Sequence, residues 1–101
     1  MLSEAHINKI KQMTEKEAQL EIKEYWGHIK EFRSALEENP YSHIIDNLNA
    51  KIIFKHYELM QIIMLTNLNI DDDIKNSIDE VVKNNQHPIC DKYRIFREKR
   101  N

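Results

Sequence analysis

TEKEAQLEIKEYWGHIKEFRSALEE, residues 14–38, is the stretch that decides the fold. Its apolar residues recur at alternating spacings of four and three, the period of one face of an α-helix. In order, they are Ala18, Ile22, Tyr25, Ile29, Phe32 and Leu36. Thr14 and Glu17 have the spacing of a capping box, in which each side chain bonds the backbone N–H of the other residue. Residues 14–38 are therefore predicted to form one long amphipathic helix.

A second long helix is predicted over residues 42–67, after Pro40 has ended the first. Its apolar residues cover more than half of the helical circumference, so it must be shielded from several directions. We expect this helix at the centre of the structure. The link between the two long helices is short, which makes them antiparallel neighbours.

Three shorter helical segments flank this pair. Ser3 is a suitable N-cap for a first helix to about residue 13, and residues 71–83 carry isoleucines and valines along one stripe. Residues 89–101 form a basic C-terminal segment, expected as a short helix or a tail. The predicted fold is all-α: an up-down helical bundle of about four helices with this segment added, as a single domain over residues 1–101.

Composition agrees with a small helical domain. The 101 residues are 41% hydrophobic and 32% charged, which is too apolar for a disordered chain and suits one modest core. One glycine and two prolines are too few for the many turns of all-β or α/β folds. The heavy use of Ile, Asn and Lys is typical of AT-rich bacterial and phage genomes.

The sequence predicts a cytoplasmic protein. No uninterrupted apolar run approaches the length of a transmembrane helix, and the N-terminus has neither the basic nor the apolar region of a signal peptide. Cys90 is the only cysteine, so an internal disulfide and a paired-cysteine zinc site are excluded. We expect Cys90 to be a half-buried, inert thiol.

No motif for catalysis, metal binding or a cofactor is present. The five histidines form none of the paired spacings of metal sites, and the nearest group, Glu24, His28 and Glu31, is expected to make ion pairs on a helix surface. Gly27 is the sole glycine, which excludes a phosphate-binding P-loop. Inside a helix, Gly27 costs about 1 kcal/mol against alanine, so it is either neutral drift or a point of close packing. His56 lies within the apolar stripe of residues 42–67, so we expect it to be at least half-buried and structural.

Four apolar side chains are candidates for partner binding. Trp26 flanks the helical seam and Leu20 lies on its outward side, while Phe54 and Leu65 point away from the main stripe of the second long helix. Aromatic anchors beside apolar surface are typical of interface hot spots. The alternative is that Trp26 closes the edge of the core.

We therefore predict a non-enzymatic protein that acts by binding a protein partner or by forming a homodimer. In size and helix pattern it is similar to small bacterial and phage inhibitors, immunity proteins and antitoxins. The alternative is a nucleic-acid-binding regulator that uses the C-terminal cations. These are Lys92, Arg94, Arg97, Lys99 and Arg100.

Nucleic-acid binding is expected to be weak at most. The five cations are offset by two carboxylates, and the whole chain carries a net charge of −2. We see no helix-turn-helix pattern. Tyr93 and Phe96 are instead expected to dock on the bundle, against the acidic segment 71–88.

Overall fold

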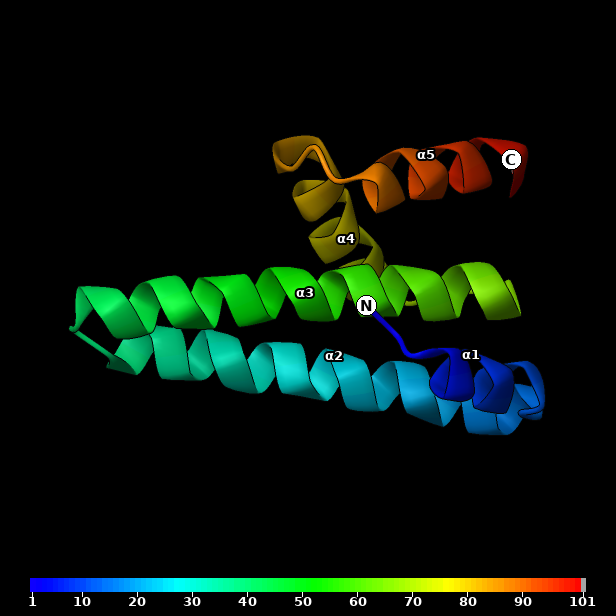
Figure 1. The fold of residues 1–101 in the computed structure, drawn as a ribbon, viewed down its shortest axis with the longest axis horizontal. Helices are drawn as coiled ribbons and strands as arrows, with labels where there is room; N and C mark the ends of the chain where they lie inside the picture. Colours follow the sequence, from blue (N-terminus) through cyan, green and yellow to red (C-terminus); the bar gives the residue numbers. More distant parts are fainter. Residues whose placement is uncertain (101) are drawn as a thin grey trace.

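The chain folds into five α-helices in a computed structural model that describes residues 1–100 (Figure 1). They are α1 (Glu4–Lys11), α2 (Glu15–Glu38), α3 (Ser42–Thr66), α4 (Asp72–Asn84) and α5 (Pro88–Arg100). Helices make up 83% of the described residues, which include no strand. The all-α prediction is confirmed. The structure has five helices rather than about four, because the basic C-terminal segment, which was expected as a short helix or a tail, is helical.

Local hydrogen bonds fix the helix ends. The His6 backbone N–H donates to the Ser3 hydroxyl at 3.1 Å, which caps α1. Both bonds of the Thr14–Glu17 capping box are present, at 3.1 and 3.2 Å, and they hold the pKa of the Glu17 carboxyl below its usual value. At the end of α3, Asn67 takes the left-handed conformation and donates its N–H to the Ile63 carbonyl. Short-range sequence signals therefore predicted the starts of α1 and α2.

α2 and α3 lie side by side and antiparallel, as predicted (Figure 1). The predicted seam of α2 faces the core: Ala18, Ile22, Tyr25 and Ile29 are buried. Its last two members, Phe32 and Leu36, are only half-buried. That end of α2 meets the first turns of α3, which contain no buried residue.

α3 is the central helix, because it contacts α1, α2, α4 and α5. Its buried residues lie from Ile52 onward, where these neighbours gather: Ile52, His56, Tyr57, Leu59, Met60, Ile62 and Ile63. α5 lies on the side of α3 opposite α2, and α4 runs across α3 to reach it (Figure 1). The up-down description therefore fits the α2–α3 pair, whereas α4 is a crossing helix. Within residues 1–100, no helix is both long and apolar enough to cross a membrane.

Candidate functional site

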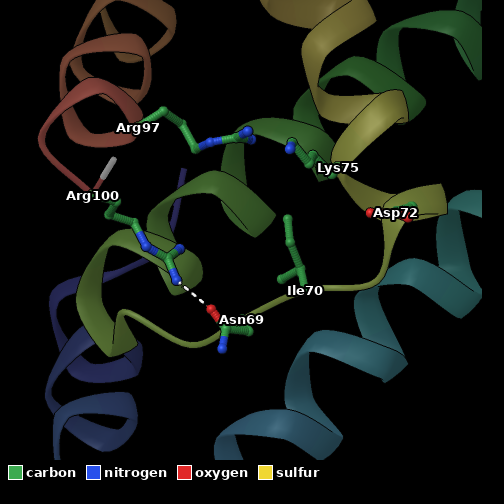
Figure 2. A pocket seen from close by; sticks show the side chains of 6 residues that line it. All are labelled: Asn69, Ile70, Asp72, Lys75, Arg97 and Arg100. Carbon is green, nitrogen blue, oxygen red and sulfur yellow. Dashed lines mark hydrogen bonds between the residues drawn. The ribbon is translucent and has the colours of Figure 1, made fainter.

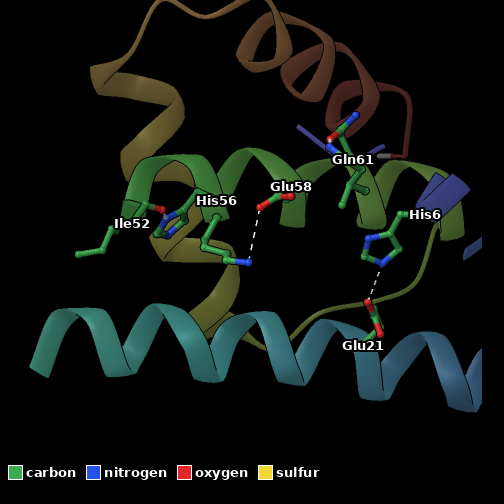
Figure 3. Close-up of polar contacts among 8 residues, drawn as sticks. His6, Glu21, Ile52, His56, Glu58 and Gln61 are labelled. Atoms are coloured by element: carbon green, nitrogen blue, oxygen red, sulfur yellow. Dashed lines mark hydrogen bonds and ion pairs between the residues drawn. The ribbon is translucent and has the colours of Figure 1, made fainter. Parts of the chain in front are cut away.

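A buried polar network joins α2, α3 and α4. The His56 side chain is 0% exposed, with Nδ1 2.7 Å from the Ile52 carbonyl oxygen and Nε2 2.7 Å from the Ser77 hydroxyl. A carbonyl oxygen can only accept, so Nδ1 carries the proton and Nε2 accepts from Ser77. The Ser77 oxygen in turn accepts from the Arg33 guanidinium at 2.6 Å. Figure 3 shows His56 against Ile52 within α3.

The groups of this network are buried and bond one another within the fold. Burial lowers the pKa of His56 below its ordinary value of 6.5, and the positive charge of Arg33 acts in the same direction. A serine bonded to a neutral histidine is the pairing used in nucleophilic catalysis. Here, however, Ser77 is only 8% exposed and His56 is fully covered, so a substrate cannot reach either group. The predicted burial of His56 is confirmed.

The Cys90 thiol is buried, and His6 pairs with a glutamate. Cys90 is 1% exposed, and burial raises the pKa of its thiol, which keeps the sulfur protonated. Nowhere in residues 1–100 do three or more His, Cys, Asp or Glu side chains gather as a metal site would require. His6 on α1 instead meets Glu21 on α2 at 2.9 Å, an interhelical contact that no sequence pattern indicated (Figure 3).

Phe54 and Leu65 lie on one side of α3. They are eleven residues apart, which is about three helical turns or roughly 16 Å along the axis. Phe54 is 56% exposed, and its ring meets the edge of Tyr57, which stacks on His87 with 4.5 Å between ring centroids. Leu65 is half-buried. The structure therefore brings these two candidate residues onto one face.

Leu20 and Trp26 lie elsewhere. Leu20 is 59% exposed and sits about 160° around α2 from Ile22, so it points away from α3. Trp26 is half-buried, packs against the core, and lies 5.6 Å from the guanidinium carbon of Arg33, on the side of α2 that meets α4. The four candidates therefore do not form one surface, and Trp26 closes the edge of the core.

An apolar hollow of about 280 Å³ lies where α1, α3 and α5 meet. We call it the α1–α3–α5 groove, and its lining residues are Met1, Ile7, Gln61, Met64, Leu65, His87, Pro88, Ile89 and Lys92. α2 contributes no residue to this lining. Of the four candidates, only Leu65 lines the groove. Phe54 is connected to the groove indirectly, because its ring contacts Tyr57 and Tyr57 contacts the lining residue His87. Met1, Ile7 and Met64 were not candidates from the sequence, because their meeting depends on how α1 docks on α3.

The C-terminal cations do not form one basic face. Arg94 pairs with Asp91 at 3.0 Å on the exposed side of α5, and Lys92 lines the α1–α3–α5 groove. Tyr93 is buried and Phe96 packs against the core, which confirms their predicted docking on the bundle. Arg94 and Arg97 line one hollow together with Lys83, and Arg97 and Arg100 line another.

The hollow lined by Arg97 and Arg100 lies between α4, α5 and the loop that follows α3 (Figure 2). We call it the basic hollow. Its lining residues are Asn69, Ile70, Asp72, Lys75, Arg97 and Arg100. Lys75 was not a sequence-based candidate, since it lies in an acidic segment and nothing local links it to α5.

The chain matches no family model, and no curated protein and no solved structure is similar to it at a significant level. A functional proposal therefore depends on the geometry of the chain.

Proposed function

We propose that this chain is a non-enzymatic binding protein whose protein partner inserts apolar side chains into the α1–α3–α5 groove. The supporting observation is the groove itself, where apolar side chains from three helices surround one hollow at the protein surface. Two of the lining residues are methionines, whose flexible side chains adapt to the shape of a bound partner. Binding of this kind is the mode of action of small inhibitors and regulators in bacteria and phages.

The partner segment we propose is an amphipathic helix with an acidic residue beside its apolar stripe. Lys92 is the only Lys, Arg, Asp or Glu in the groove lining, so the rim favours a partner carboxylate. The exposed ring of Phe54 extends the apolar surface along α3. The roughly 16 Å from Leu65 to Phe54 corresponds to about three turns of a docked helix.

The test is a capture experiment from the native host with matched variants. Leu65→Glu replaces apolar surface in the groove with a carboxylate. Lys92→Glu reverses the charge at its rim. Ile95→Glu and Leu20→Glu are the controls, because both residues are more than half exposed and neither lines the groove. We expect one protein, identified by mass spectrometry, to be retained by the wild type and both controls and lost with both groove variants.

Titration calorimetry of that purified partner then gives the loss of affinity, which we expect to exceed about 1 kcal/mol for each groove variant. Circular dichroism must show that the variants remain folded. Sedimentation of the isolated chain measures its oligomeric state, which tests whether a second copy occupies the groove. A partner that binds wild type and Leu65→Glu equally would place the interface elsewhere and refute this proposal.

The nucleic-acid alternative has less geometric support. Lys92 lines the α1–α3–α5 groove and Arg94 pairs with Asp91, so the five predicted contacts are not all free on one face to follow a nucleic-acid backbone. Submicromolar binding at physiological salt that is lost on removal of residues 91–101 would favour that alternative.

A further inference from the structure

The basic hollow brings cations from two helices to face one another. Lys75 reaches in from α4 and Arg97 from α5, and their charged ends point toward each other across it (Figure 2). Arg100 lies at the same hollow, next to Asn69. Like charges held close together repel, and an anion placed between them would be attracted by each. The hollow has a volume of about 320 Å³.

Hydrogen-bond acceptors within the fold hold the two guanidinium groups in place. Arg100 donates to the Leu68 carbonyl at 3.3 Å and to the Asn69 side-chain oxygen at 2.8 Å. Arg97 donates to the Tyr93 hydroxyl at 3.3 Å. A guanidinium has five N–H donors, so each keeps donors for a further acceptor. Because they are already oriented, a ligand has less side-chain motion to restrict.

The carboxylates near the hollow do not cancel its positive charge. Asp72 lines it, and Asp79 lies 3.5 Å from Arg97. Lys75 makes no ion pair with any side chain of residues 1–100, and the bonds of Arg100 are to neutral groups. Within residues 1–100, two of the three cations therefore have no carboxylate partner. Asp72 in turn disfavours a ligand whose negative charge extends to the α4 side.

We propose that the basic hollow binds the phosphate group of a small phosphorylated molecule. Phosphate suits the site because its oxygens accept several charge-assisted hydrogen bonds at once, and Arg97 and Arg100 offer planar donor pairs for them. The volume exceeds what a phosphate group needs, and Ile70 in the lining offers apolar contact to an attached organic group. The basic hollow shares no lining residue with the α1–α3–α5 groove, so the two sites are tested separately.

The experiment is calorimetric titration of the full chain with inorganic phosphate and with pyrophosphate, at low ionic strength. Lys75→Gln and Arg97→Gln are the test variants, and Lys75→Gln is the cleaner one because Lys75 has no ion pair with the described residues to lose. Lys99→Gln is the matched control, because it removes one positive charge from α5 outside the hollow. One charge-assisted hydrogen bond corresponds to about a tenfold or larger loss of affinity. We expect that loss in both test variants and an unchanged affinity in the control.

Three results would overturn the proposal. The first is the absence of phosphate and pyrophosphate binding to the wild type. The second is an equal loss in Lys99→Gln, which would indicate diffuse attraction to α5. The third is tight binding of a short nucleic acid at physiological salt, weakened as much by Lys99→Gln as by Lys75→Gln, which would make the whole of α5 a nucleic-acid interface. Thermal unfolding of each variant, compared with wild type, separates lost binding from lost folding.

Discussion

The buried imidazole of His56 should make the stability of the fold fall as the pH is lowered from 7.5 to 5.5. The neutral ring is required in the folded state, since Nδ1 donates to Ile52 and Nε2 accepts from Ser77. Burial accordingly lowers the pKa of His56 below 6.5. In the unfolded chain the same ring protonates near its ordinary pKa. Below that pH the unfolded state binds more protons than the folded state, and stability is lost.

The size of the effect follows from this difference in bound protons. If His56 stays neutral in the folded state down to pH 5.5, one proton per molecule favours unfolding, which amounts to about 1.4 kcal/mol per pH unit below 6.5. Between pH 7.5 and 5.5 the contribution of His56 is therefore at most about 1.4 kcal/mol. For a domain of this length, that lowers the melting temperature by about 5 to 11 °C.

The assay compares thermal melts of wild type and His56→Gln at the two pH values. Other titrating groups contribute equally to both proteins, so the difference between the two pH dependences isolates His56. The melting temperature of His56→Gln should fall less on acidification than that of the wild type. Ser77→Ala separates burial from hydrogen bonding: it should lower stability by about 1 to 3 kcal/mol at pH 7.5, yet keep the pH dependence. Parallel pH dependences of wild type and His56→Gln would refute the assignment of a buried, neutral His56.

Four other substitutions test the fold and the candidate anchor Phe54. Gly27→Ala should stabilise the fold by about 0.5 to 1 kcal/mol in urea unfolding, since an added Cβ meets nothing within 4 Å and the backbone is helical; a loss of stability would contradict this reasoning. Thr14→Ala should cost about 1 kcal/mol in the same assay by removing the capping box, and an unchanged unfolding midpoint would show that the cap contributes nothing. Ile29→Ala should cost about 2 to 5 kcal/mol because its side chain is 0% exposed, whereas Phe54→Ala should cost less and weaken partner binding by more than about 1 kcal/mol. The reverse pattern, with Phe54→Ala unfolding the protein and leaving binding unchanged, would place that ring in the core.

The helices could be predicted from the sequence because their signals are local. The capping box of Thr14 and Glu17 lies within four residues, and the α2 seam repeats within a few turns. The central place of α3 also followed from a local property, the wide apolar circumference of that helix. The sequence left two explanations for Gly27, neutral drift and close packing. Close packing is wrong, since the space beside Gly27 is open.

The candidate sites could be predicted only in part, because they depend on contacts between distant residues. The Ser77 hydroxyl bonds His56 across 21 residues and Arg33 across 44. Lys75 and Arg97 meet only because α4 crosses α3 and α5 packs beside it. No periodicity within one helix encodes such a crossing. Apolar surface on α3 was foreseen, but the positions of α1 and α5 decided which part of it became a groove.

The position of Cys90 also provides a way to follow motion of the last helix. The thiol is in the first turns of α5 and is the only one in the chain, so a thiol reagent can react at one place alone. While α5 stays packed, the reagent has almost no access, because Cys90 is 1% exposed. The rate of modification therefore reports how often α5 detaches, a local opening that global unfolding measurements do not resolve. This rate can be measured with and without phosphate, or with a partner in the groove. A ligand that stabilises the packed position of α5 would slow the modification of Cys90.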